Sequence, residues 1–263
     1  MRNITKNALI LALNSKGELN KDVTILTEDE GIVRATLYGG AKSKLRSLVS
    51  PLNSGKVWLY RDESKKNCKI SDFLVEKCRL SIRESLVKSA QAEIMTEILI
   101  RTKAAGSPAE SWILANAFLD GMDYFDDDES RRGFVRFLWR YLDILGERPS
   151  IFECSRCAER FVFLRGKNES ARVSLKREYD WFDWIEKAFV CGNCVKNEES
   201  RLSKVPSSVL EYLWNVSTLS PKEARAIPLT SEVLFDARTF CLSLIENAIA
   251  FPLKSVRATE VFL

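Results

Sequence analysis

Residues 31–47 read GIVRATLYGGAKSKLRS, and this stretch decides how the first third of the chain is interpreted. Apolar residues alternate with Arg34, Thr36 and Tyr38, which is typical of a strand with one buried face. Two glycines at 39 and 40 then allow a sharp turn. The predicted loop beyond them carries three cations and no carboxylate, which favours contact with a polyanion, although a solvated basic hairpin loop fits as well. The cations are Lys42, Lys44 and Arg46.

Four further runs of strand-forming residues lie around this stretch. They cover residues 8–13, 23–26, 56–60 and 68–75, with turn residues between them. Five short strands in about 75 residues indicate a small closed barrel. We expect an oligonucleotide-binding (OB) type barrel over residues 1–79, while an SH3-like barrel fits the strand count nearly as well.

The periodicity becomes helical from residue 80 onward, so the fold class is α+β. Ile82, Leu86, Ala90, Ile94 and Ile98 form a core-facing stripe. A second helix is expected to begin with Ser107 as its cap and Pro108 in its first turn, and a third near Ser130. Helices are also expected at 206–216 and 230–250, followed by a short extended tail after Pro252. The predicted helical domain therefore comprises residues 80–150 and 200–263, with a cysteine-containing module inserted at 151–199.

Composition restricts the function. The chain contains no histidine, which excludes His-dependent nucleophilic catalysis and His metal ligands. No apolar run reaches the length of a membrane span and no signal peptide is recognisable, so we expect a cytoplasmic protein without a membrane partner. Residues 1–80 contain 15 Lys and Arg against 9 Asp and Glu, whereas the remainder contains 25 against 27. This imbalance indicates an anion-binding surface in the N-terminal third.

Two cysteine pairs are the strongest chemical signal. Cys154 and Cys157 form one Cys-x2-Cys pair, and Cys191 and Cys194 form the other. Four thiolates on two tight turns suit a structural Zn²⁺ site with no open position for a catalytic water. The alternative is two unrelated thiol pairs in a reduced protein. Cys68, Cys78 and Cys241 are interpreted as small core residues.

Two charged groups leave alternatives open. The acidic cluster of residues 123–129 is either a Mg²⁺ site, and hence a nuclease centre, or a set of carboxylates that cap the next helix. Arg132, Arg136 and Arg140, with Arg131 beside them, form a basic stripe on that helix. This stripe is either a solvated edge or a surface that receives an acidic peptide with an apolar terminus.

Taken in order, these segments resemble the bacterial recombination-mediator family RecO. The resemblance begins in NALILALNSKGELNKDVTILTEDEGIVRATLYGGAKSK (7–44) and continues in SPLNSGKVWLY (50–60). It extends through the helical middle to Leu145-Gly146, Pro149 and Cys154-x2-Cys157. The resemblance implies a non-enzymatic protein that binds single- and double-stranded DNA and anneals complementary strands. It also implies that the protein works with RecR, grips the acidic C-terminal tail of single-stranded-DNA-binding protein and helps RecA to load.

The residues that we expect to contact DNA come from the opening stretch. Cations there neutralise phosphates and release counterions, while an aromatic ring can stack on a base. An adaptor that is stabilised by zinc and does not bind DNA is the main alternative. The expected DNA-contacting residues are Arg34, Tyr38, Lys42, Lys44 and Arg46, and the expected tail-binding residues are Arg131, Arg132, Arg136 and Arg140.

Overall fold

The structure is a computed structural model that describes residues 2–39, 43–62, 67–161, 178–195 and 200–263. The chain divides into two compact units. One comprises Met1–Phe137, Ile144–Gly146 and Ile245–Leu263, and the other comprises Leu138–Asp143 and Glu147–Leu244. The division into three segments made from the sequence stays a prediction.

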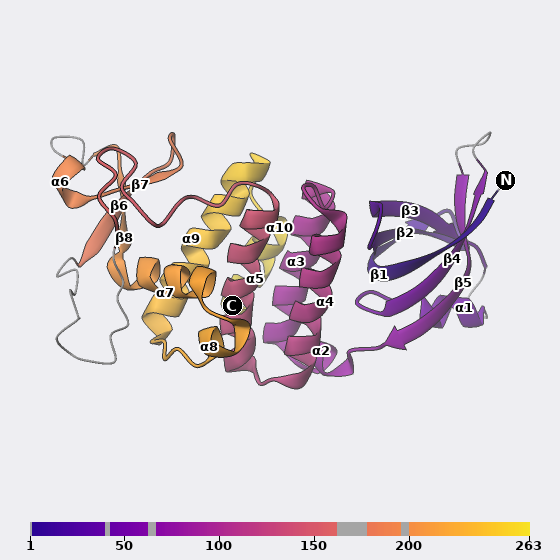
Figure 1. Cartoon of the computed structure of the whole chain (residues 1–263). Helices are drawn as coiled ribbons and strands as arrows, with labels where there is room; N and C mark the ends of the chain where they lie inside the picture. The colour runs from indigo at the N-terminus through magenta and orange to yellow at the C-terminus, as the bar shows by residue number, and fades with distance from the viewer. Residues whose placement is uncertain (1, 40–42, 63–66, 162–177, 196–199) are drawn as a thin grey trace. The chain divides into compact units, whose positions relative to one another are not determined.

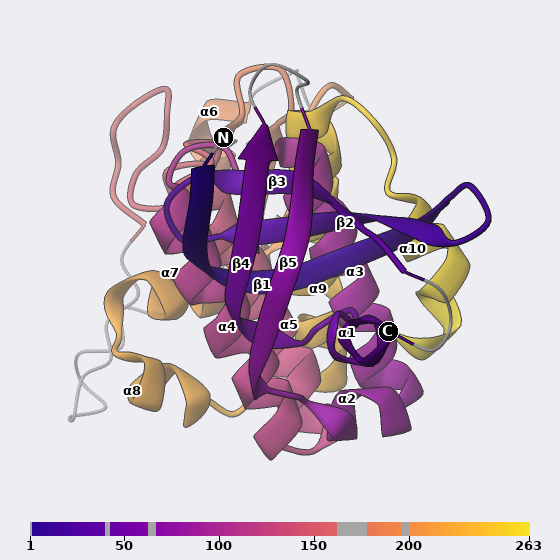
Figure 2. The same ribbon diagram turned by 90° about the vertical axis from the view of Figure 1, so that its right-hand side faces the viewer.

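Five strands of the first unit form a closed barrel (Figure 1). Their order is β1-β2-β3-β5-β4; β1 pairs with both β2 and β4, and β3 pairs with β5 in parallel. This OB-type barrel confirms the predicted fold class, although β1 begins earlier than expected. Figure 2 shows β4 and β5 crossing the near side of the barrel. The strands are β1 (Arg2–Lys16), β2 (Asn20–Thr27), β3 (Gly31–Leu37), β4 (Ser54–Asp62) and β5 (Asn67–Lys77).

The alternation in β3 places one set of its side chains inside the barrel. Val33, Ala35 and Leu37 are buried in the barrel core, and Arg34 between them is exposed. The expected basic loop is not wholly irregular, because Lys44–Leu48 form the short helix α1. Leu45 of α1 and the following Val49 pack against the barrel core, so burial of these side chains stabilises a helical turn that the sequence alone did not reveal.

The barrel also packs against helices of its own unit. Leu9 and Leu26 pair across β1 and β2 and are fully buried, yet they lie outside the barrel's internal core. Helix α4 (Pro108–Tyr124) contacts β2 and β3. Arg79 adds a polar connection, because its guanidinium donates to Asp120 of α4 and to the carbonyl oxygen of Leu52.

Helix α4 and the helix that follows it begin where the sequence supplies caps. The Ser107 side chain accepts the backbone N–H of Glu110, and Pro108 occupies the first turn of α4, as predicted. The next helix, α5, begins at Asp127, three residues before Ser130, because the Asp126 carboxylate accepts the Glu129 N–H at 2.8 Å. The helices of this part of the chain are α2 (Leu80–Glu84), α3 (Leu86–Thr102), α4 (Pro108–Tyr124) and α5 (Asp127–Ile144).

The second unit contains a three-stranded sheet of order β7-β6-β8. Phe182 of β6 is fully buried and packs edge-on against Phe189 of β7 and Phe240 of α9. No described helix of either unit is both long and apolar enough to cross a membrane. The remaining elements of this part are β6 (Tyr179–Asp183), β7 (Ala188–Val190), α6 (Gly192–Val195), β8 (Ser203–Pro206), α7 (Ser207–Thr218), α8 (Pro221–Arg225) and α9 (Ser231–Ile249), which continues into the first unit.

The expectation of an extended tail was wrong. Lys254–Thr259 form helix α10, followed by a 3₁₀ turn, η2 (Glu260–Phe262). The Glu97 carboxylate of α3 accepts the backbone N–H groups of Lys254 and Ser255 at 3.2 and 2.8 Å. The cap of this helix therefore comes from a residue more than 150 positions earlier, which local sequence cannot indicate.

Candidate nucleic-acid interface and metal centre

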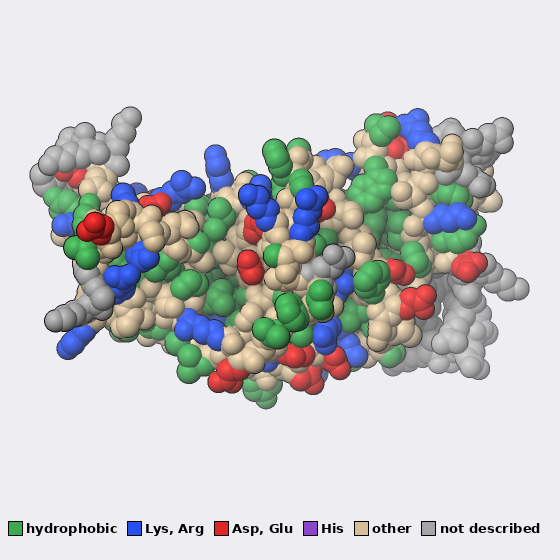
Figure 3. Space-filling model, turned by 180° about the vertical axis from the view of Figure 1, so that it is seen from behind, with side chains coloured by type: hydrophobic (Ala, Val, Ile, Leu, Met, Phe, Trp, Pro, Cys, Tyr) green, Lys and Arg blue, Asp and Glu red, His purple; other side chains and the backbone are tan. Residues whose placement is uncertain are grey.

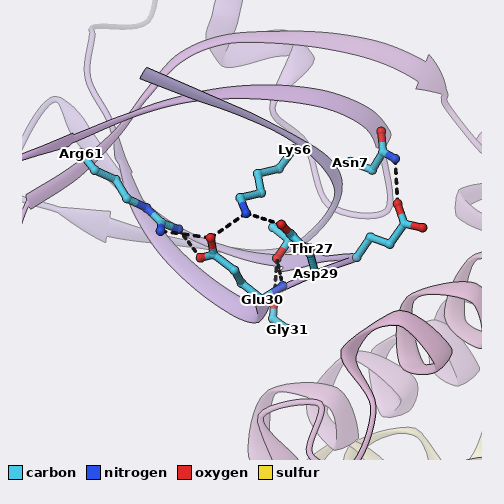
Figure 4. Close-up of polar contacts among 8 residues, drawn as sticks. Lys6, Asn7, Thr27, Asp29, Glu30, Gly31 and Arg61 are labelled. Carbon is cyan, nitrogen blue, oxygen red and sulfur yellow. Dashed lines mark hydrogen bonds and ion pairs between the residues drawn. The ribbon is translucent and has the colours of Figure 1, made fainter. Parts of the chain in front are cut away.

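The two ends of β3 carry opposite charge. The strand begins at Gly31, the last residue of the acidic turn Glu28–Gly31, and ends before the basic stretch, roughly 20 Å away at about 3.3 Å per residue. Figure 4 shows that the acidic turn is neutralised locally by side chains of β1 and β4. Lys6 forms ion pairs with Asp29 and Glu30, and Arg61 binds both carboxylate oxygens of Glu30 at 3.1 and 2.5 Å.

These contacts fix the charge states at the acidic end. The hydrogen bond from Arg61, reinforced by Lys6, lowers the pKa of Glu30 below its ordinary value. Burial opposes the charged form of Lys6, but its hydrogen bonds to Asp29 and Glu30 outweigh burial and raise the lysine pKa. Both partners therefore stay ionised at neutral pH, and two cations of the N-terminal third serve the barrel's own structure.

The basic end is arranged differently. An ideal Cβ on Gly39 would lie 3.2 Å from the Ser43 Cβ, so the chain returns close to the end of β3 just before α1 begins. Lys44 is exposed and Arg46 is half-buried. Because these residues are two positions apart on a helix, they point to different sides of it. Lys42 lies outside the described residues.

The cations in the middle of β3 and just beyond its end are not paired with carboxylates in the part of the chain that the structure describes. Among the described residues, no carboxylate forms an ion pair with Arg34, Lys44 or Arg46, whereas Lys6 and Arg61 are both paired. Tyr38 follows β3 directly and is 48% exposed. In the view from behind, with the barrel on the left, Lys and Arg side chains spread over the barrel (Figure 3). These properties allow the end of β3 to bind an anion, while contact of each residue with DNA stays a prediction.

Sequence reasoning overlooked the outer surface of β4 and β5. Residues 56–60 were interpreted only as a strand, yet alternation places Lys56, Trp58 and Tyr60 on one face. Tyr60 pairs with Lys69 of β5, whose Nζ lies 4.6 Å from the ring centroid. The alternation itself could have revealed this aromatic and basic face.

The four paired cysteines converge on one point. The sulfur atoms of Cys154, Cys157, Cys191 and Cys194 all lie within 4.8 Å of one another, and those of Cys157 and Cys191 are 3.7 Å apart. Four thiolates bound to Zn²⁺ at about 2.3 Å lie roughly 3.8 Å apart, so the observed spacing fits a tetrahedral thiolate site. The cluster could hold a metal ion, and the donor set suits zinc.

Backbone geometry positions the thiols. Ala158 adopts a left-handed conformation and donates its N–H to the Cys154 carbonyl oxygen, which closes the first turn. The second pair follows β7 directly and is closed by a hydrogen bond from the Cys194 N–H to the Cys191 carbonyl oxygen. The Ser155 N–H donates to the Phe189 carbonyl oxygen of β7, which ties the first turn to the sheet.

The thiols differ in acidity. Burial raises the pKa of Cys191 to about 12. Burial also opposes ionisation of Cys154, but N–H groups led by that of Cys191, 3.3 Å from the sulfur, lower its pKa to about 7. Donors aimed at this sulfur favour the thiolate that a metal needs.

The other three cysteines differ in their surroundings. Cys241 is fully buried and Cys68 packs against the barrel core, as expected. The assignment of Cys78 to the core was wrong, because this residue follows the end of β5 and is exposed.

The arginines of α5 are largely engaged by nearby acids. Arg131 pairs with Asp128, while Arg132 and Arg136 both pair with Glu129. The Arg136 side chain is mostly buried, and Arg131 and Arg132 are about one-third exposed. Their role in binding a partner's tail stays a prediction, as does that of Arg140.

The acidic cluster of residues 123–129 works as a set of local caps. Asp123 accepts the Ser81 N–H and hydroxyl, and Asp127 accepts the Ser85 hydroxyl at 2.7 Å. Together with the Asp126 cap of α5, these contacts favour the capping interpretation over a Mg²⁺ site. Within the described ranges, the four cysteines are the only group of three or more His, Cys, Asp or Glu side chains that could hold a metal ion.

Comparison with known proteins covers both parts of the chain. Residues 1–72 match the family model described as "Recombination protein O N terminal", and residues 83–257 match "Recombination protein O C terminal". A protein of Heliobacterium modesticaldum named "DNA repair protein RecO" is 24% identical over 226 residues, which are 85% of this chain and 77% of the relative. A protein of the same name from Bacillus pumilus is 22% identical over 209 residues, covering 78% of this chain and 73% of the relative.

Proposed function

The chain belongs to the recombination protein O family, whose members act in DNA repair and recombination, and from this premise we propose that it anneals complementary DNA strands. In this proposal the protein binds single- and double-stranded DNA without making or breaking covalent bonds. Together with RecR, it helps RecA to load on DNA that is coated by single-stranded-DNA-binding protein. It acts in the cytoplasm, where bacterial DNA is found.

The separation of charge along β3 supports this proposal most strongly. At one end, Lys6 and Arg61 pair with the acidic turn and have little attraction left for DNA. Arg34 in the middle of the strand, and Lys44 and Arg46 beyond its other end, form no ion pair with a described carboxylate. A phosphate backbone is therefore attracted toward the end of β3 and finds no unpaired cation of this kind among the described residues at its beginning.

Annealing follows from charge neutralisation. Two complementary strands repel each other, and each phosphate contact that the protein makes releases condensed counterions and reduces this repulsion. Two strands held on one cationic surface can then pair without nucleotide hydrolysis. Bound strands leave their hydrogen-bonding edges available as long as the protein contacts only phosphates and ring faces.

We propose that the four cysteines hold a structural Zn²⁺ ion. A bound ion would fix both cysteine turns against β7 and stabilise the small module around them, as four-thiolate sites do. No DNA-contacting residue of the proposal lies among the ligands. The proposed role of the metal is therefore to stabilise the fold.

Partner binding is assigned to α5. The acidic tail of single-stranded-DNA-binding protein would contact Arg131, Arg132, Arg136 and Arg140. The one-third exposure of Arg131 and Arg132 supports such contact. An incoming carboxylate must compete with Asp128 and Glu129 for these guanidinium groups, so we expect tail binding to be weak at high salt.

A charge reversal with a matched control tests the DNA contact. Lys44→Glu should weaken binding of a single-stranded oligonucleotide and reduce the slope of log affinity against log salt by about 0.7 or more. Lys222→Glu makes the same charge change at an exposed lysine of α8 and should have a much smaller effect. Fluorescence anisotropy across a salt series measures both quantities. Equal effects of the two substitutions would show that only net charge matters and would contradict a defined site at the end of β3.

A further inference from the structure

The outer surface of β4 and β5 joins the end of β3 through a continuous series of side chains. We propose that Tyr38, Trp58 and Tyr60 form a stacking surface for the bases of single-stranded DNA, hereafter the aromatic face. This inference rests on the proposed function, because it assigns the part of the barrel that contacts bases rather than phosphates.

Strand register places the three rings on the same side of the sheet. In β4, Val57 and Leu59 are buried in the barrel core, so Trp58 and Tyr60 between and after them face outward. Their Cα atoms are about 7 Å apart at two residues along a strand, which is room for two separate bases. Both side chains are half-buried, so part of each ring is accessible.

Contacts on β5 connect these rings to Tyr38. The Asn67 side-chain amide donates a hydrogen bond to the Tyr38 hydroxyl at 3.4 Å. Two residues further along the same strand face, Lys69 pairs with Tyr60 and holds its ammonium group 4.6 Å from the ring centroid. Tyr38, Asn67, Lys69 and Tyr60 therefore form one connected series, and Trp58 extends it along β4.

The charge around the aromatic face suits a nucleic acid. Lys56 is exposed two residues before Trp58, and Lys69 lies beside Tyr60. On β3, Arg34 shares the outward side with Tyr38. Register places three carboxylates near this face: Asp72 opposite Trp58, Asp62 opposite Asn67 and Asp22 opposite Thr36. Asp72 accepts the Phe73 N–H at 2.8 Å, and Asp62 is buried. Cations beside stacked rings are the combination that single-strand-binding surfaces use.

The packing of the barrel explains why this side is available. Leu9 and Leu26 are fully buried and α4 contacts β2 and β3, so helices cover that side of the barrel. Trp58, Tyr60 and Lys69 lie on β4 and β5, away from those contacts, and retain partial exposure. A base inside a duplex has both ring faces covered by its neighbours, so rings on this surface select single strands.

Stacking also suits the annealing reaction. A base that stacks on a side chain uses its ring face and leaves its Watson–Crick edge open. A strand bound in this way is kept from folding on itself and can still meet its complement.

The experiment separates base contacts from phosphate contacts. Affinities for an oligothymidine, an abasic oligomer of equal phosphate number and a duplex are measured for the wild type and for Trp58→Leu and Tyr38→Leu. Tyr124→Leu is the matched control, because Tyr124 is 84% exposed at the end of α4, far along the chain from the aromatic face. Thermal unfolding verifies that each variant is folded.

We expect each of the two substitutions in the aromatic face, Trp58→Leu and Tyr38→Leu, to weaken oligothymidine binding about 5- to 150-fold. The salt slope and the affinity for the duplex should not change. The wild type should bind the abasic oligomer more weakly than oligothymidine by a comparable factor. This comparison needs no variant, so it does not depend on whether Trp58→Leu folds. Equal wild-type affinity for the thymidine and abasic oligomers would overturn the inference while leaving phosphate binding, and hence the proposed function, in place. Failure of the wild type to bind any of the three would instead refute the proposed function.

Discussion

Replacement of Glu97 by Gln should remove a pH-dependent contribution to stability. The Glu97 carboxylate accepts hydrogen bonds from the Ser255 hydroxyl at 2.6 Å and from the N–H groups of Lys254 and Ser255, and Arg101 lies 2.6 Å away. Burial raises the pKa of this carboxyl, but the four contacts outweigh burial and lower it from 4.5 to about 2. The ionised form thus holds α10 against α3.

The size of the effect follows from this shift. One pKa unit corresponds to about 1.4 kcal/mol, so the difference from 4.5 to about 2 gives roughly 3 kcal/mol of stabilisation at pH 7 as an upper value. Because the folded-state pKa is depressed, the contribution is complete above the unfolded value and is lost as pH falls toward 2. At pH 3 less than half of it should remain.

Urea unfolding of wild type and Glu97→Gln at pH 7 and pH 3 measures this difference. Glu93→Gln, one helical turn earlier at an exposed position, is the matched control and should change stability by less than about 0.5 kcal/mol. Hydrogen exchange at pH 7 should locate the loss in Lys254–Thr259. A destabilisation of the same size at both pH values, or none at pH 7, would refute the account of the Glu97 cap.

Three further substitutions test other contacts. Arg79→Gln should destabilise the first unit by about 3–5 kcal/mol in urea unfolding, because Asp120 and Asn116 lose a buried partner, and Arg79→Lys should not restore the loss. Gly55→Ala should sharply lower the melting temperature, since a Cβ there would lie 2.0 Å from the Leu74 carbonyl oxygen; a wild-type melting curve would contradict that packing. Elemental analysis of the wild type should find about one zinc ion per chain, and Cys154→Ser should abolish zinc binding. A wild type that takes up no zinc when it is refolded with zinc would refute the site.

Local pattern predicted the parts of the fold that local interactions stabilise. Alternation in residues 31–37 and the cap at Ser107 were sufficient to place β3 and α4. Helices α1 and α10 were missed because packing of Leu45 on the barrel and the distant Glu97 carboxylate stabilise them. Tertiary contacts of this kind leave no periodic signal in the sequence.

The candidate sites show the same contrast. Cysteine spacing was enough to predict four converging thiols, since each pair is held by its own turn. The basic stretch indicated cations, but the helical turn that separates Lys44 from Arg46 could not be foreseen. The connection from Tyr38 to Lys69 needed the register of strands that are far apart in sequence.

Strand annealing across a salt series tests the central claim most directly. Two complementary oligonucleotides, one carrying a fluorophore and the other a quencher, are mixed with the protein between about 50 and 200 mM salt, with and without single-stranded-DNA-binding protein. We predict that the protein accelerates annealing, that the acceleration declines as salt rises, and that Lys44→Glu reduces it far more than Lys222→Glu. An annealing rate equal to that of the oligonucleotides alone, or an acceleration that salt does not alter, would contradict the account.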